Sequence, residues 1–434
     1  MDEVHKDLRR PQPLGVFPLP TGYLLVPSSD DPSVDEARAA MAAGRLPTAW
    51  PDTLAAHRLA HAGDLDGALA VLGTDAVGSF NRYVIDPTDV DRDALRAALP
   101  ADLAPLVDVV AYACGLVDVP PGEGDATGEV LALVRAARAT ALLEGGDASG
   151  AVDMLNEAAH AAEPVSTPLA AVLLGNAAVI AHDHQLPDAD PINELAAVLT
   201  VLQDTDLTVA RAELHLQLGL FVHEVAATGR RPLTDAVDHY YSALQLVGRS
   251  TAPHVWASAN LNLGTAYLTM PMVEASDQLR AGIAMQALRA SLEVFTREEF
   301  PQEWASAQMN LANALVYTPS THQGDNIVEA VERYEEVLEL RERQGDPIGR
   351  ARILANQGNA LAHLGVFDHA KSKLLEARFL FEEQGDIDGV LAVRSVLDEI
   401  ARQVVPGSQG PRYGVPQGGE VELVRELREQ EITP

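Results

Sequence analysis

Hydrophobic residues recur with a helical period along most of this chain. From about Trp50 onward, alanine and leucine return at intervals close to 3.6 residues, and Gly-Asp pairs and prolines interrupt them. The N-terminal segment differs, because its many prolines preclude a helix. Within it, Tyr23 to Val26 is typical of a short strand or of an extended segment packed on the body. The pattern therefore predicts an all-α body behind an extended N-terminal segment.

An internal repeat is the most informative feature of the body. Trp256-Ala257-Ser258-Ala259 leads to Asn262, Leu263 and Gly264. A similar block runs from Trp304 to Asn310, Leu311 and Ala312, and a third runs from Ala351 to Asn356 and Gly358. Each block is followed by a second helix that carries its own small residues. Those small residues are Ala236, Ala284, Ala330 and Ala370. Glycine or alanine at a helix crossing lets two helices approach closely, so the pattern predicts stacked helix pairs.

The residues of these blocks resemble the tetratricopeptide repeat family, which has Leu-Gly-x-x-Tyr in one helix and Ala-x-x-x-Tyr-x-x-Ala-Leu in the next. The join Phe300-Pro301-Gln302-Glu303-Trp304-Ala305 is similar to that of long-repeat arrays in bacterial signalling proteins, although the chain has no room for the C-terminal caspase-like domain of some of those proteins. One departure is that Trp256 stands seven residues before Leu263 instead of three. The resemblance implies a right-handed α-solenoid of helix pairs with an extended concave surface.

The strength of the repeat divides the chain into five predicted parts. They are an extended N-terminal segment (1–47), degenerate helical repeats (48–127), tetratricopeptide-like repeats (128–207), well-formed repeats with a capping helix (208–403), and a flexible linker with a short amphipathic helix (404–434).

The resemblance also implies a peptide-binding groove along the first helices of the repeats. The residue before each Leu-Gly position is Gln217, Asn262, Asn310 or Asn356, and the residue three positions after each of these is Leu220, Thr265, Asn313 or Asn359. Tyr317 and Arg352 are two further candidates, because they could bind a carboxylate or an aromatic anchor residue of a peptide. Amide side chains can pair with an extended peptide backbone. The alternative is structural, with the same amides bonding to turns or to neighbouring helices.

Charge narrows the range of partners. The formal net charge is −32, with 31 Lys plus Arg against 63 Asp plus Glu, which disfavours binding to nucleic acid or to an anionic membrane. Two interpretations of the acidity remain open, namely steering of a basic partner and simple solubility. No apolar run is long enough for a membrane span, and the polar N-terminus does not resemble a secretory signal, so we expect a cytoplasmic protein.

Candidate chemistry is sparse. His182-Asp183-His184 suggests metal ligands, but alternate residues on a helix do not face one way, so a solvated turn is favoured. Cys114, the single cysteine, lies in an apolar run and is expected to be a buried thiol. No phosphate-binding loop, zinc motif or nucleophile elbow is present. We therefore expect no catalytic residue, metal or cofactor, and we do not expect an enzyme.

Three hypotheses for the function follow. The first is a scaffold or adaptor that holds a peptide or helix of a partner protein in its groove. The second is a dedicated assembly chaperone for an enzyme subunit. The third is a self-assembling structural module, a homo-oligomer in which the amphipathic segment around Val421, Leu423, Val424 and Leu427 fills the groove of a neighbouring copy.

Overall fold

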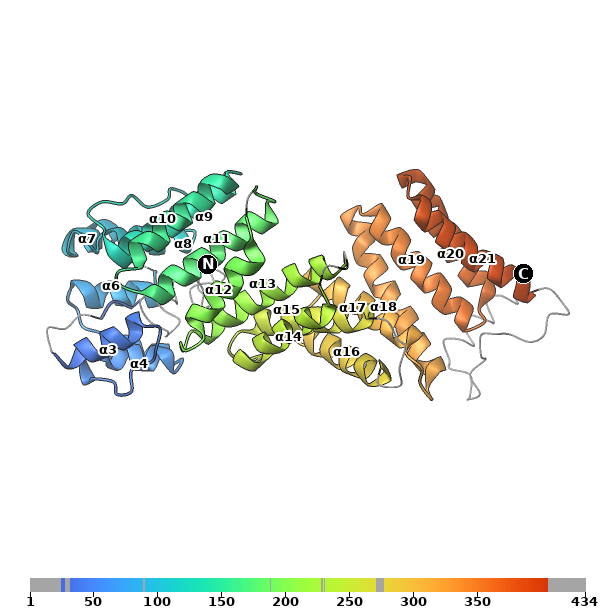
Figure 1. The fold of residues 1–434 in the computed structure, drawn as a ribbon, viewed down its shortest axis with the longest axis horizontal. Coiled ribbons are helices and arrows are strands. Elements are labelled where there is room, and N and C mark those ends of the chain that lie inside the picture. Colours follow the sequence, from blue (N-terminus) through green and yellow to red (C-terminus); the bar gives the residue numbers. More distant parts are fainter. Residues whose placement is uncertain are drawn as a thin grey trace. The chain divides into compact units, whose positions relative to one another are not determined.

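The computed structural model describes residues 25–27, 32–88, 90–187, 189–227, 229, 231–270 and 277–404. These residues form 19 α-helices and one short 3₁₀ helix, and no strand occurs among them (Figure 1). This confirms the predicted all-α body. In the same residues, every helix is too short or too polar to cross a lipid bilayer.

The chain divides into two compact units, Met1–Val255 and Trp256–Pro434, which are called here the N-terminal unit and the C-terminal unit. The helices of the N-terminal unit are α3 (Ser33–Ala42), α4 (Ala55–His61), α5 (Leu65–Val71), α6 (Ala76–Ile85), α7 (Arg92–Ala98), α8 (Pro105–Ala113), α9 (Gly128–Glu144), α10 (Ala148–Ala162), α11 (Thr167–Asp183), α12 (Pro191–Leu202), α13 (Thr208–Ala227) and α14 (Leu233–Leu246), with the 3₁₀ helix at Asp52–Leu54. The boundary falls inside α15 (Pro253–Thr269). The C-terminal unit continues with α16 (Asp277–Ser291), α17 (Pro301–Tyr317), α18 (Gln323–Gln344), α19 (Pro347–His363), α20 (Phe367–Gln384) and α21 (Ile387–Val404).

Each helix packs mainly against the helix that follows it in the chain. In the N-terminal unit the largest contacts join α9 to α10, α10 to α11 and α13 to α14, and in the C-terminal unit they join α17 to α18, α18 to α19 and α19 to α20. Consecutive packing of neighbouring helices is the arrangement expected of a helical solenoid.

Glycine marks the closest helix crossings, as the repeat predicts. A Cβ added to Gly264 in α15 would lie 2.7 Å from Cγ of Leu288 in α16, and one added to Gly358 in α19 would lie 2.7 Å from Cγ of Leu374 in α20. Both leucines are fully buried. The two repeats therefore use the same contact, a leucine packed directly on the backbone of the preceding helix.

A five-residue Gly-Asp-x-x-Gly turn joins helices at four places. Its first glycine has a positive φ, for example +66° at Gly345, which ends a helix in the left-handed conformation. The aspartate then accepts a hydrogen bond from the backbone N–H of the second glycine, as between Asp346 Oδ1 and Gly349 N (2.8 Å), and so caps the next helix. The four copies span 63–67, 146–150, 345–349 and 385–389.

The N-terminal segment differs in part from the prediction of an extended 1–47. Residues 33–42 form α3, because the sequence between Pro32 and Pro47 contains no proline and presents Val34, Ala37 and Met41 to the core. The preceding piece is extended and packed on the body: Leu25 is fully buried, and the Val26 backbone exchanges two hydrogen bonds with the Asn81 side chain (2.8 and 3.0 Å).

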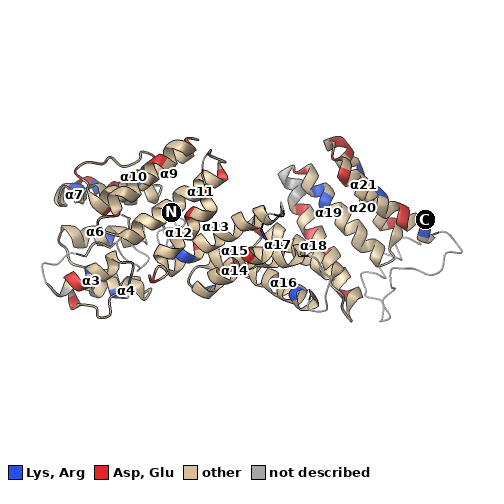
Figure 2. Ribbon diagram, viewed as in Figure 1, with Lys and Arg blue, Asp and Glu red and all other residues tan. Residues whose placement is uncertain are grey.

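The predicted capping helix corresponds to α21, which ends at Val404. The linker and amphipathic segment predicted over 404–434 lie, from residue 405 onward, outside the described residues. Acidic positions are spread along the helices of both units (Figure 2).

Candidate functional site

The structure brings six of the predicted site residues together along α15, α17 and α19. These residues, called here the amide ladder, are Thr265, Asn310, Asn313, Tyr317, Asn356 and Asn359. At its first step Asn310 Nδ2 donates to Thr265 Oγ1 (2.8 Å), and the same hydroxyl donates to the carbonyl oxygen of Leu261 (2.8 Å). The threonine thus links two successive repeats through one hydrogen-bonded hydroxyl.

The next steps of the ladder join α17 to α18 and α19. Asn313 Oδ1 accepts hydrogen bonds from the hydroxyl of Tyr334 (2.6 Å) and from Asn356 Nδ2 (3.2 Å). Burial raises the pKa of the Tyr334 hydroxyl, which therefore stays a donor. At the outer end, Asn359 Nδ2 donates to the Tyr317 hydroxyl (2.8 Å), and Tyr317 is an exposed side chain.

The remaining predicted residues stand apart from the ladder. Asn262 donates back to the carbonyl oxygen of Ser258 in its own helix (2.9 Å), Arg352 is exposed on α19, and Gln217 is half-buried on α13 of the N-terminal unit. These contacts match the structural alternative, in which the amides bond to their own or to neighbouring helices. Peptide binding at these positions stays a prediction.

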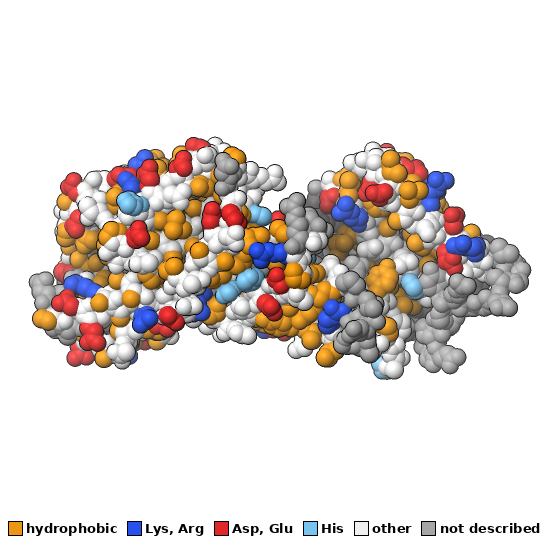
Figure 3. Space-filling view, in the orientation of Figure 1, with side chains coloured by type: hydrophobic (Ala, Val, Ile, Leu, Met, Phe, Trp, Pro, Cys, Tyr) orange, Lys and Arg blue, Asp and Glu red, His pale blue; other side chains and the backbone are white. Residues whose placement is uncertain are grey.

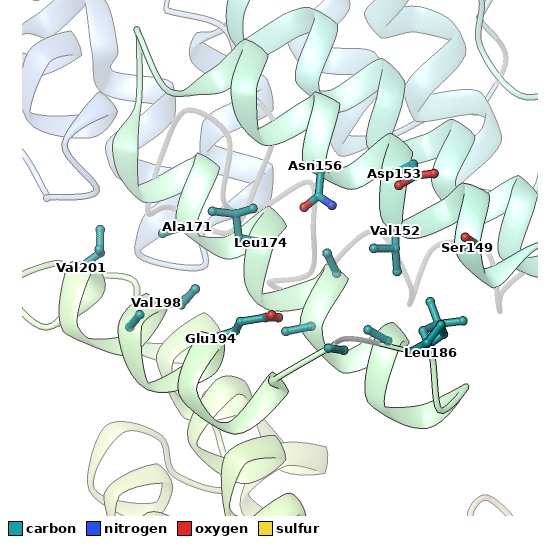
Figure 4. Close-up of a pocket in the computed structure, with 16 residues that line it drawn as sticks. Ser149, Val152, Asp153, Asn156, Ala171, Leu174, Leu186, Glu194, Val198 and Val201 are labelled. Carbon is teal, nitrogen blue, oxygen red and sulfur yellow. The ribbon is translucent and has the colours of Figure 1, made fainter.

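A different surface, a groove between α10, α11 and α12, has the features of a binding site. Its volume is about 600 Å³, which lies within the range of ligand sites. Figure 4 shows its side chains lying around the space between the three helices. The apolar lining includes Val152, Ala171, Leu174, Ala178, Val198 and Val201.

The groove exists because small residues face it from the central helix. α11 contributes alanines at four positions of the lining, so its backbone leaves room that larger side chains would fill. On another side of α11, a Cβ on Gly175 would lie 2.7 Å from Leu214 of α13, so the helix is held closely there. Leu174 and Val201 remain 43% and 47% exposed in the groove, which leaves aliphatic surface open to a ligand.

A second, polar cavity of about 620 Å³ adjoins the groove. This polar pocket is lined by residues at the end of α11 and by Glu224 of α13. His182 Nε2 lies 2.9 Å from Glu224 Oε2, and the His182 ring stacks on Phe221 with 3.6 Å between centroids. His182 is thus a packed, paired side chain in the last turn of α11 and not part of a solvated turn, whereas Asp183 and His184 are exposed.

Three other chemically active side chains, Cys114, His215 and His239, lie elsewhere in the N-terminal unit. Cys114 is buried at the end of α8, as predicted. His215 of α13 and His239 of α14 approach to 3.2 Å between their Nδ1 atoms, and burial lowers the pKa of both. Among the residues with described positions, no three His, Cys, Asp or Glu side chains are placed to hold a metal ion.

Sequence analysis missed the α10–α12 groove because its residues belong to no motif. Alanines on α11 are equally typical of a helix crossing, and Leu174 forms a Leu-Gly pair with Gly175 that is expected to face a neighbouring helix. Only the exposure of Leu174 and Val201 separates groove residues from core residues, and exposure requires the packed structure.

Comparison with known proteins adds no relative. No protein-family model matches the chain, and no curated protein is significantly similar to it.

Proposed function

We propose that this chain is a protein-binding scaffold and that the α10–α12 groove holds a segment of its partner. The observation that supports the proposal is the groove itself, about 600 Å³ of mainly apolar space with two partly exposed aliphatic side chains on adjacent helices. Grooves between helices commonly accept the apolar face of a helix or peptide.

The amide ladder supports this role less directly. Its amides already have partners inside the C-terminal unit, so a peptide would have to compete with those hydrogen bonds. The groove offers the partly exposed aliphatic surface of Leu174 and Val201, and covering that surface yields a favourable hydrophobic contribution. A partner would therefore bind first at the groove.

The test is affinity capture from the native host with a matched pair of variants. Leu174→Arg places a charge in the groove, and Leu116→Arg places the same charge at a leucine of similar exposure (40%) outside it. We expect a partner captured by the wild type to be retained by Leu116→Arg and lost from Leu174→Arg. Retention by both variants would reject the groove as the binding site.

The same experiment also tests the amide ladder as an alternative binding site and distinguishes the scaffold from the other two functional hypotheses. Loss of the partner from an Asn310→Ala/Asn356→Ala double variant, but not from Leu174→Arg, would move the site to the ladder. An assembly chaperone would recover only an immature form of its partner, whereas a self-assembling module would recover only further copies of this chain.

A further inference from the structure

We infer that the partner segment is cationic as well as apolar: it places aliphatic side chains in the α10–α12 groove and a lysine or arginine in the adjoining polar pocket. This inference rests on the proposed function and specifies the chemistry of the partner.

The two cavities adjoin each other in the N-terminal unit, and together they are called here the depression. They share the lining residues Ala181, Leu186 and Ala189, which lie at the end of α11 and in the connection to α12. A bound segment can therefore pass from apolar to polar surroundings without leaving the protein surface. In Figure 3, hydrophobic side chains reach the surface of this unit over α10 and α11.

The charged side chains of this depression are nearly all carboxylates. Asp153 and Glu194 line the groove, while Asp183 and Glu224 line the polar pocket. Neither lining contains a lysine or arginine among the residues with described positions, and the remaining titratable group is His182, which pairs with Glu224.

The ends of two helices border the polar pocket. α11 ends at Asp183 with a partial negative charge, and α12 begins at Pro191 with a partial positive charge, so the two helix ends offset each other and the carboxylates determine the sign of the potential. Among the described residues, Glu194 accepts one long hydrogen bond, from the backbone N–H of Asp190 (3.4 Å), so its carboxylate retains capacity for another donor. A cationic side chain would complement this carboxylate.

Charge also distinguishes between candidate occupants. The chain's own segment 420–430 has an apolar stripe, but it contains more glutamates than arginines. Its net negative charge would face the carboxylates of the depression and oppose docking there. A basic amphipathic segment of another protein has the complementary charge, and we therefore assign the depression to such a partner.

The inference is tested with four synthetic peptides and the full-length protein. The first carries leucines at positions i, i+3, i+4 and i+7 with lysines beside them, the second has glutamate in place of every lysine, the third has glutamine in place of every leucine, and the fourth is the chain's own 420–430 segment. Fluorescence anisotropy measures the affinity of each peptide. We expect the first peptide to bind at least about tenfold more tightly than the other three, a difference of about 1.4 kcal/mol.

Variants with uncharged replacement side chains locate the binding site on the protein. Leu174→Gln, and separately Asp153→Asn/Glu194→Gln, should weaken binding of the first peptide by about tenfold and severalfold respectively, whereas Leu116→Gln should leave it unchanged. Because Leu174 and Leu116 are both partly exposed, both single variants should fold, and thermal melts followed by circular dichroism verify this.

The outcomes separate this inference from the function on which it rests. Equal binding of the lysine and glutamate peptides, both weakened by Leu174→Gln, would overturn the cationic assignment and leave the groove as a peptide site. If Leu174→Gln leaves the affinity of every peptide unchanged, both proposals are overturned. Tightest binding by the 420–430 peptide would make the chain's own tail the occupant and would also overturn the inference.

Discussion

Leu374 fills the space that a Cβ on Gly358 would need, with its Cγ only 2.7 Å from that position. Gly358→Ala should therefore destabilise the C-terminal unit by about 1–3 kcal/mol, because the fully buried leucine and the Ala370 carbonyl oxygen, 3.1 Å from the same position, would have to shift. Chemical denaturation of the full chain measures the change in the free energy of unfolding.

Gly282 provides the matched control for that substitution. It lies within helix α16, and nothing lies within 4 Å of an added Cβ. Gly282→Ala should raise stability by roughly 0.5–1 kcal/mol, because alanine loses less backbone entropy in a helix. If the two substitutions changed the free energy of unfolding equally, the close approach of Leu374 to Gly358 would not be what disfavours a Cβ at that position.

The Gly-Asp-x-x-Gly turn gives a second prediction. Asp346→Ala removes the side-chain acceptor for the Gly349 N–H, and it should lower stability by about 1 kcal/mol, the usual effect of losing an N-cap. Asp398→Ala, an exposed position inside α21, should have a much smaller effect in the same denaturation assay. A loss at Asp398 as large as that at Asp346 would contradict the capping role.

The amide ladder gives a third prediction through the buried hydroxyl of Tyr334. Asn313→Leu removes the acceptor for this hydroxyl, and an unpaired buried hydroxyl costs about 1–3 kcal/mol. Tyr334→Phe in the same background should recover much of that loss, because the buried hydroxyl is then absent and the other donor to Asn313, Asn356 Nδ2, belongs to a half-buried side chain. A double-mutant cycle measures the coupling between the two residues, and a coupling energy near zero would exclude the hydrogen bond as a stabilising contact.

The His215–His239 pair predicts a dependence of stability on pH. Burial lowers the pKa of His215 to about 4, and His239 and Arg211 act in the same direction, whereas an unfolded histidine titrates near ~6.5. Between these values the unfolded chain binds more protons than the folded chain, so stability should fall as the pH is lowered through this window. Denaturation midpoints measured between pH 4 and pH 7 test this.

Two variants isolate that contribution. His215→Gln should reduce the slope of stability against pH in the window, because it removes one buried titrating ring. His160→Gln changes an exposed histidine and serves as the control for the substitution itself. If His215→Gln leaves the slope intact, other groups determine the pH dependence.

The repeat pattern predicted where helices of the C-terminal unit cross closely. Gly264 and Gly358 lie at such crossings, each packed against a buried leucine, Leu288 or Leu374, because a close crossing requires a small residue at a particular place. The helix over 33–42 was missed, since the prolines before it dominate the local composition and its buried face depends on a body distant in sequence.

The candidate site was less predictable for a physical reason. Asn313 and Asn356 were predicted to be peptide-groove residues, but their sequence positions do not distinguish a bond to a peptide from a bond between neighbouring helices. The groove is the space between three helices beside Leu174 and Val201. Such a space depends on how the helices pack together, so the sequence of any one helix does not indicate it.

The four Gly-Asp-x-x-Gly turns also bear on how such a chain can change in length. Each turn provides the hydrogen-bond acceptor for its own second glycine, because the backbone N–H of that glycine donates to the aspartate three residues earlier. This bond needs no residue from a distant part of the chain. A helical hairpin bounded by such turns can therefore be duplicated, removed or transplanted with its connections intact, provided that its crossing residues fit the new neighbours. These turns are natural points for recombination and for the design of longer or shorter arrays.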